Sequence, residues 1–101
     1  MNKIGHGDVR LFKETMPIDG LVDEKSNIVQ HGEATGHAHR LYGNAQLFTH
    51  TPTKTRWLRV LEPTDLLHEE HKALTIPPGE YRIGIVRESD HIDGITRQVR
   101  D

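Results

Sequence analysis

Short segments in which apolar and polar residues alternate recur along the whole chain. The clearest covers residues 80–88, where Tyr81, Ile83 and Ile85 fall on one face of an extended strand. Segments of the same character occupy residues 8–13, 27–31, 37–42, 45–50, 56–61, 73–76 and 95–100. No segment repeats its apolar residues at helical spacing over about ten positions. The pattern therefore predicts strands through most of the chain.

Turn-forming residues separate these segments. They occupy residues 17–20, 32–36, 43–44, 51–53, 63–64, 77–79 and 93–94. Strands punctuated at this spacing indicate an all-β sandwich or barrel. One segment differs, because Thr64 or Asp65 can cap a short helical turn. We therefore expect a single all-β domain over residues 1–101, a small barrel or sandwich with one short helical turn near residues 64–71.

Composition and charge narrow the class of protein. With 101 residues, 34% of them hydrophobic, the chain can build one thin core that a metal ion or homo-oligomerisation would reinforce. The net charge of −2 argues against a protein that coats DNA non-specifically. The first residues lack a signal-peptide core, and no run approaches the roughly 18 apolar residues of a membrane helix. We expect a cytoplasmic protein that does not enter a membrane.

Histidine is the unusual residue in this composition, with eight in 101 positions. Five of the eight lie in two short segments, HGEATGHAHR at residues 31–40 and LHEEH at residues 67–71. The chain has no cysteine, so a transition-metal site must use imidazole and oxygen ligands. Residues two apart on a strand face the same way. His37 and His39 can therefore present two imidazoles to one ion, at zinc–nitrogen distances of about 2.0–2.1 Å.

The second segment adds two imidazoles at a different spacing. His68 and His71 are three apart, which places them on one face of a helical turn, whereas in a single extended strand they would face opposite ways. We expect a site for a divalent transition metal (Zn, Mn, Fe or Ni), with an open position that holds water for hydrolysis. Glu33 is a candidate fourth ligand or general base. The ligand candidates, in order, are His37, His39, His71, His68 and His31.

A plainer interpretation stands beside this one. LLHEEHK can be a solvated turn of charges, and a lone H-x-H often occurs without a metal. His6, His50 and His91 are isolated, near turns or termini, where surface positions account for them. We therefore place none of these three in the site.

The same side chains allow chemistry without a metal. Two histidines beside a phosphodiester can act as general base and general acid, and RNA brings its own 2′-hydroxyl nucleophile. Arg40 and Arg82 can hold the phosphate through guanidinium–oxygen pairs. This second hypothesis is an RNA-cleaving or RNA-binding protein, with His37, Glu33 and Arg40 as catalytic candidates. In either chemistry the substrate is a small molecule or carries phosphate.

A third hypothesis is a non-enzymatic interaction module. Histidine changes its charge near neutral pH, so a histidine-rich surface can adjust partner binding between about pH 5.5 and 7.5. Such a module would need neither a metal ion nor a substrate.

Two fragments resemble the cupins, small β-barrels that often hold a transition metal. HAH at residues 37–39 resembles the paired histidines of their first motif, and PPG at residues 77–79 resembles the Pro-x-Gly turn of their second. Residues 43–44 are Gly and Asn where the first motif has a glutamate, and Arg82 stands where the second has a histidine. From this resemblance, only the two histidines of the first motif carry over as ligands.

A longer resemblance covers residues 28–100. The combination of HGEATGHAHRL, LLHEEHKALTIPPGEYRI and VRE is similar to a group of small bacterial and phage-type proteins without assigned function. The resemblance implies no activity, but it favours treating several polar residues as one group. These are His31, Glu33, His37, His39, Arg40, His68 and His71.

Overall fold

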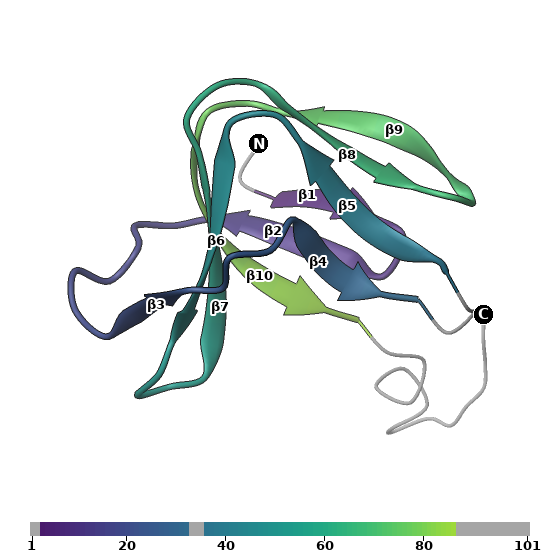
Figure 1. The fold of residues 1–101 in the computed structure, drawn as a ribbon. Coiled ribbons are helices and arrows are strands. Elements are labelled where there is room, and N and C mark those ends of the chain that lie inside the picture. Colours follow the sequence, from purple (N-terminus) through teal and green to yellow (C-terminus); the bar gives the residue numbers. More distant parts are fainter. Residues whose placement is uncertain (1–2, 33–35, 87–101) are drawn as a thin grey trace.

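The computed structural model of the chain describes residues 3–32 and 36–86, and every regular element in these residues is a β-strand (Figure 1). The strands are β1 (Lys3–His6), β2 (Val9–Lys13), β3 (Leu21–Asp23), β4 (Ile28–His31), β5 (Ala38–Tyr42), β6 (Ala45–His50), β7 (Thr55–Val60), β8 (Thr64–His68), β9 (His71–Ile76) and β10 (Gly79–Ile85). They confirm the predicted all-β class. The predicted strand at residues 95–100 lies outside the described residues, as do Glu33 and His91.

The strands form two antiparallel sheets that face each other as a sandwich (Figure 1). The larger sheet has six strands in the order β1-β2-β10-β7-β6-β3, and the smaller has four in the order β4-β5-β8-β9. Within residues 3–32 and 36–86 the sheets do not close into a barrel. Of the two predicted alternatives the sandwich is therefore observed, and the barrel that a cupin resemblance implied is not.

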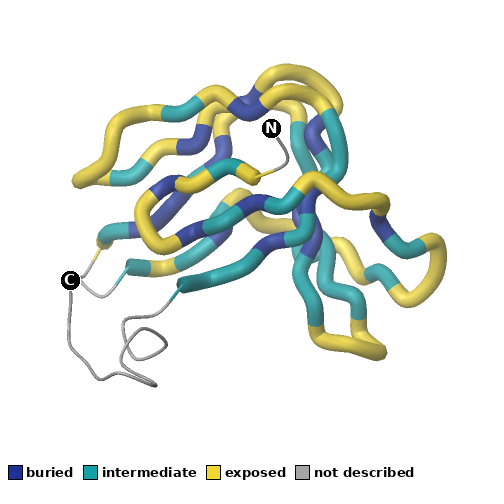
Figure 2. The backbone as a smooth tube through the Cα atoms, turned by 180° about the vertical axis from the view of Figure 1, so that it is seen from behind, coloured by how far each residue is buried: buried dark blue, intermediate teal, exposed yellow. Residues whose placement is uncertain are grey.

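The core lies between the sheets and draws side chains from both. Leu11, Leu47 and Leu58 come from the six-stranded sheet, and Leu66 and Ile76 come from the four-stranded sheet. Each is at most 1% exposed. Figure 2 shows that buried residues recur within the strands, whereas exposed residues concentrate in the connections. The alternation read from the sequence thus corresponds to inward-facing and outward-facing side chains.

The helical turn predicted near residues 64–71 is wrong. Thr64–His68 and His71–Ile76 form two strands, β8 and β9, which pair as an antiparallel hairpin with a two-residue turn. Burial along β8 alternates from one residue to the next, which is the period of a strand. Packing of this apolar face against the core therefore outweighs the helix-capping signal at Thr64 and Asp65.

An arginine links the two sheets at one end. Arg56 of β7 donates to both carboxylate oxygens of Glu24, at 2.9 and 2.8 Å. The same guanidinium also donates to the backbone carbonyls of Val29 and Ile28, which belong to β4 in the other sheet. Only 17% of the Glu24 side chain is exposed, so the pair is partly shielded from water. The Arg56 hydrogen bonds, opposed by burial, hold the pKa of the Glu24 carboxyl below its usual value of 4.5.

We expect the substitution Glu24→Gln to lower the free energy of unfolding at pH 7 by about 1–2 kcal/mol, because charge-assisted hydrogen bonds are lost while some solvent screening remains. A carboxyl whose pKa is lowered by folding stabilises the protein above its unfolded pKa, and this contribution disappears as pH falls through the folded pKa. Urea unfolding should therefore show a difference from wild type at pH 7 that vanishes well below pH 4.5. The matched change in exposed Glu62, to Gln, should have little effect at either pH.

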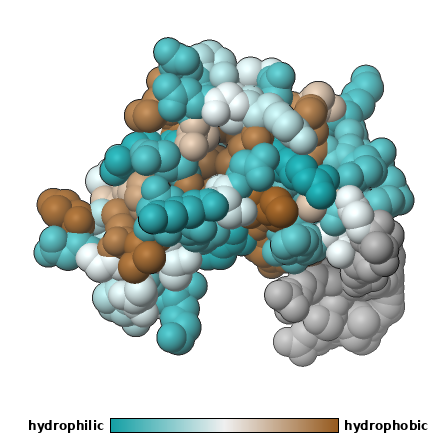
Figure 3. Space-filling model, in the orientation of Figure 1, coloured by the Kyte–Doolittle hydropathy of each residue, from teal (hydrophilic) through white to brown (hydrophobic). Residues whose placement is uncertain are grey.

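The outer surface is polar, with a few exposed apolar side chains. On the face in Figure 3 hydrophilic residues predominate, and a hydrophobic group lies at the end that carries β3. Ile18 and Val22 are the apolar residues exposed in that segment, at 94% and 54%. In the part of the chain that the structure describes, no helix is long and apolar enough to span a membrane.

Candidate metal centre

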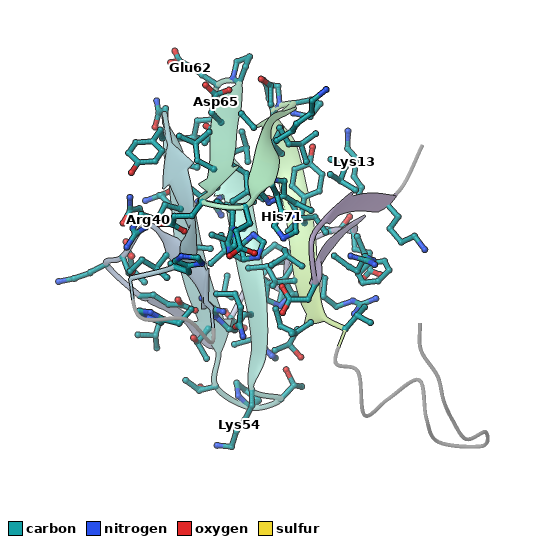
Figure 4. All side chains as sticks on the ribbon, turned by 90° about the vertical axis from the view of Figure 1, so that its right-hand side faces the viewer. Lys13, Arg40, Lys54, Glu62, Asp65 and His71 are labelled. Carbon is teal, nitrogen blue, oxygen red and sulfur yellow. The ribbon has the colours of Figure 1, made fainter. Side chains whose placement is uncertain are left out.

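Five imidazoles gather where the N-terminal hairpin of the six-stranded sheet meets the four-stranded sheet. The ring centroids of His39 and His68 are 4.4 Å apart, and those of His68 and His71 are 4.7 Å apart. His6 joins them from β1, with its ring centroid 5.0 Å from that of His39. Figure 4 shows His71 near the middle of the molecule, between β9 and the N-terminal strands. The remaining ring, of His37, contacts the cluster through His68.

The β8–β9 hairpin brings His68 and His71 together. The two residues pair directly across the turn formed by Glu69 and Glu70, and directly opposite residues of a hairpin project from the same face. The pairing shifts by one residue within this hairpin. Leu66 is opposite Leu74, but His68, two residues further along β8, is opposite His71, which lies three residues before Leu74. This irregularity places His71 on the same face as His68 and Leu66, because a shift of one residue reverses the face of a strand, and His71 remains exposed there.

His39 reaches the cluster from β5. It is only 2% exposed and lies two residues before Leu41, which is also buried, so both side chains point inward. His37 precedes the strand and leaves 27% of its side chain exposed. Its Nδ1 lies 3.4 Å from a carboxylate oxygen of Glu70, and its ring centroid is 5.7 Å from that of His68. The predicted pair His37 and His39 falls into two different groups of candidate ligands among the described residues.

Two sets of side chains have spacing suited to a metal ion. In the first, His39, His68 and His71 each offer a ring nitrogen, and the three nitrogens lie within 4.8 Å of one another. In the second, His37 and His68 combine with a carboxylate oxygen of Glu69 at the same limit. Nitrogen ligands of a tetrahedral zinc ion are about 3.3 Å apart. Small side-chain rotations would therefore suffice to close the first set around an ion.

The second set is less suited to binding because its carboxylate already has partners. Glu69 accepts a hydrogen bond from the backbone N–H of Ala38 and forms an ion pair with Arg40, both at 3.0 Å. These contacts lower the pKa of the Glu69 carboxyl to about 2. The largest effect comes from the hydrogen bond of the Ala38 N–H, followed by that of the Glu69 backbone N–H and by Arg40. An open pocket of about 260 Å³ beside this set is lined by Arg40, Tyr42, Leu67, His68 and Glu69.

His39 occupies an environment that keeps it neutral. Burial, followed by the positive charge of nearby His68 and His6, lowers its pKa to about 4, although Asp8 opposes this shift. Burial also lowers the pKa of His6. A neutral imidazole is the form that binds a metal ion, so His39 does not have to lose a proton to ligate at pH 7.

His6 and Asp8 are residues of this site that the sequence interpretation missed. The prediction that His6 is a surface residue is wrong, since it is only 6% exposed and its Nδ1 lies 2.9 Å from Nδ1 of His39. Its Nε2 donates to the backbone carbonyl of Lys72 at 2.8 Å. On the other side of the His39 ring, Nε2 lies 3.1 Å from a carboxylate oxygen of Asp8.

A sequence signal for the local part of this arrangement does exist. Gly7-Asp8 between two alternating segments is typical of a two-residue hairpin turn, which places His6 opposite Val9. Gly7 has φ of +63°, as the first position of a type II′ turn requires. The pattern does not show that this turn abuts the other sheet.

The other predicted residues that the structure describes are not members of the first set. His31 is exposed and belongs to neither set of candidate ligands among the described residues, and Glu33 falls outside them. His50 is part of an exposed pair with the Thr53 hydroxyl, consistent with a surface position. The two arginines proposed to bind phosphate are each paired with a carboxylate, Arg40 with Glu69 and Arg82 with Glu14.

Residues 5–86 match the family described as Domain of unknown function (DUF8820). The chain belongs to this family. The matched range contains every candidate ligand in the described residues, and the family description agrees with the expected lack of an assigned activity. Comparisons with curated proteins and with solved structures gave no match. The function is therefore argued from the side chains of the site.

Proposed function

We propose that this protein binds one divalent transition metal ion through His39, His68 and His71. The observation that carries the proposal is the spacing of their three ring nitrogens, which come from three strands and lie within 4.8 Å of one another. An all-imidazole set suits zinc, iron or nickel better than manganese, which prefers oxygen ligands. Zinc is the leading choice, since three histidines are a known zinc ligand set.

Burial supports the proposal. A buried polar ring needs a partner to offset its loss of hydration, and His39 is only 2% exposed. Burial, the largest influence on His39, lowers its pKa to about 4, so the ring is neutral and one of its nitrogens keeps a lone pair that can bind an ion. Clustered imidazolium rings would repel one another, whereas neutral imidazoles can share one cation.

His68 provides a local reporter for binding. The backbone N–H of Glu70 donates to His68 Nδ1 at 3.0 Å. Ligation through Nδ1 would take the lone pair that accepts this bond, and ligation through Nε2 would move the ring proton to Nδ1. For a neutral ring, coordination through either nitrogen therefore replaces the hydrogen bond. The Glu70 amide should respond to the metal even though Glu70 is not proposed as a ligand.

The proposal is tested by titrating zinc into untagged, metal-free protein. We expect about one equivalent to bind, a large shift of the Glu70 amide resonance in NMR spectra, and affinity at least tenfold lower in His68→Ala. We expect at least a tenfold decrease in affinity because the loss of even a residue that only contacts a metal ligand lowers metal affinity by about 10–100-fold. His31→Ala, which removes an exposed histidine outside both sets, should bind zinc as the wild type does. Zinc binding that survives His68→Ala but not His31→Ala would overturn the proposed ligands.

The RNA hypothesis and the interaction-module hypothesis stay predictions. Arg40 and Arg82, the proposed phosphate contacts, are each compensated by a carboxylate, which weakens support for RNA cleavage without a metal. Hydrolysis by a bound metal ion requires a water molecule at the fourth coordination position. The residue that faces this position therefore decides between a catalytic and a structural metal.

A further inference from the structure

We infer that Asp8 is the fourth ligand of the metal ion and that His6 holds His39 in its ligating orientation, so that the ion ties the N-terminal hairpin to the four-stranded sheet. The inference rests on the proposed metal binding by His39, His68 and His71. It assigns a role to two residues from the six-stranded sheet, His6 at the end of β1 and Asp8 in the turn before β2.

The three polar contacts of the His6 and His39 rings need three ring protons, one more than two neutral imidazoles carry. The Lys72 carbonyl can only accept, so His6 must carry a proton on Nε2. The contact between the two Nδ1 atoms needs a second proton, and a carboxylate acceptor at Asp8 needs a third, on His39 Nε2. Two neutral imidazoles supply only two protons. Without a further positive charge, one of the three contacts brings two lone pairs together.

A third proton on one of the rings would resolve this shortage, and so would the proposed metal ion if it lies between His39 and Asp8. His39 then donates its Nδ1–H to His6, His6 donates its Nε2–H to Lys72, and His39 Nε2 is left unprotonated toward Asp8. A metal-ligating histidine usually donates its other ring N–H to such a partner, which fixes the tautomer. His6 is thus a positioning residue that acts through His39.

The distance between His39 and Asp8 suits two ligands of one ion. His39 Nε2 and the Asp8 carboxylate oxygen are 3.1 Å apart. Zinc–nitrogen and zinc–oxygen distances of about 2.0–2.2 Å at a tetrahedral angle give a separation of about 3.3 Å. Asp8 belongs to neither set of ligand atoms that lie within 4.8 Å of one another in the described residues, so its carboxylate, about half exposed, would have to rotate toward His68 and His71 to complete the site.

A fourth ligand from the other sheet makes the site structural. Three ligands come from β5, β8 and β9 of the four-stranded sheet, and Asp8 comes from the hairpin at the edge of the six-stranded sheet. Four protein ligands leave no position for a water, as in the closed zinc sites that stabilise folds. The ion would therefore join the sheets at a second place, in addition to Arg56, whose hydrogen bonds to Glu24 and β4 also join them.

Asp8→Asn tests the fourth ligand. This change keeps the shape of the side chain and suits the hairpin turn, and we expect it to weaken zinc binding by about 10–100-fold. Cobalt(II) is the second probe. The wild-type complex should show the intense visible absorption of four-coordinate cobalt, and the variant should lose or shift it. Asp19→Asn, at an exposed loop position, is the matched control and should change neither measurement.

His6→Ala tests the positioning role. We expect weaker zinc binding by about 10–100-fold, with recovery in His6→Gln, because the glutamine carbonyl can accept the His39 Nδ1–H. In NMR spectra of the wild-type zinc complex the His39 proton should be on Nδ1. A His39 ring protonated on Nε2 instead would exclude both the Nε2 ligation and the positioning role of His6.

The outcomes separate this inference from the proposed function. A wild-type protein that binds no zinc would refute the metal site itself. Zinc binding in the wild type, together with unchanged affinity and an unchanged cobalt spectrum in Asp8→Asn, would refute only the fourth ligand. Loss of affinity in both Asp8→Asn and Asp19→Asn would attribute the effect to overall charge and would also refute it.

Discussion

Zinc at a free concentration of about 100 times its dissociation constant is expected to raise the midpoint of thermal unfolding by about 10–20 °C. A ligand that binds only the folded state at this concentration stabilises it by about 2.7 kcal/mol. For a domain of this size each kcal/mol raises the midpoint by about 4–8 °C. The effect should be large because His39 is distant in sequence from His68 and His71, so that the three ligands meet only in the folded chain.

The measurement is a thermal melt of metal-free protein followed by circular dichroism, with zinc or with EDTA. Wild type and His31→Ala should show the full shift, because His31 is exposed and lies outside both candidate sets. His39→Ala should melt at the same temperature in zinc and in EDTA. An equal zinc-dependent shift in wild type and His39→Ala would place the ion elsewhere in the molecule.

The strands could be predicted from the sequence because their signal is local. Alternation at Tyr81, Ile83 and Ile85 depends only on neighbouring positions, and these residues do lie in β10. Which strands lie next to each other in the sheets could not be predicted in this way. The strand β10 lies between β2 and β7, partners that are far from it along the chain, and no short pattern specifies such a neighbour.

The prediction that His68 and His71 lie side by side is correct, but the helical turn on which it placed them is wrong. Spacing of three residues brings His68 and His71 together on a helical turn, but a two-residue hairpin turn does the same. The turn sequence Glu69-Glu70 lacks the glycine or asparagine that usually marks a tight hairpin. Leu66 and Ile76, on either side of the turn, are both buried, and this packing against the core stabilises the hairpin.

The contacts of His6 and Asp8 could not be read from the sequence. Their contacts with His39 span 33 and 31 residues, and they depend on how the edge of one sheet meets the other. An isolated histidine carries no spacing signal, so it was interpreted as a surface residue. Burial of His6 follows only once β1 is placed beside the four-stranded sheet.

The turn between β1 and β2 offers the most direct steric test of the site. Gly7 is so close to the cluster that a Cβ atom at this position would lie 2.6 Å from His71 Nε2 and 3.1 Å from His39 Cε1. We expect Gly7→Ala to weaken zinc binding by more than about 100-fold, because both rings must stay in place to ligate and the loss of an outer partner alone costs up to about that factor. Isothermal titration with zinc measures the affinity.

The metal-free protein should tolerate the same change better. Without zinc the exposed His71 side chain can turn away from the added methyl group. The remaining cost comes from the positive φ of Gly7, +63°, and we expect it to lower the free energy of unfolding by about 1–2 kcal/mol in urea with EDTA. Gly36→Ala separates the two effects, since Gly36 has φ of +83° but nothing within 4 Å of its added Cβ. That control should lose similar stability and keep its zinc affinity. If Gly7→Ala instead binds zinc within threefold of wild type, His71 and His39 do not ligate from the positions that their rings occupy beside this turn.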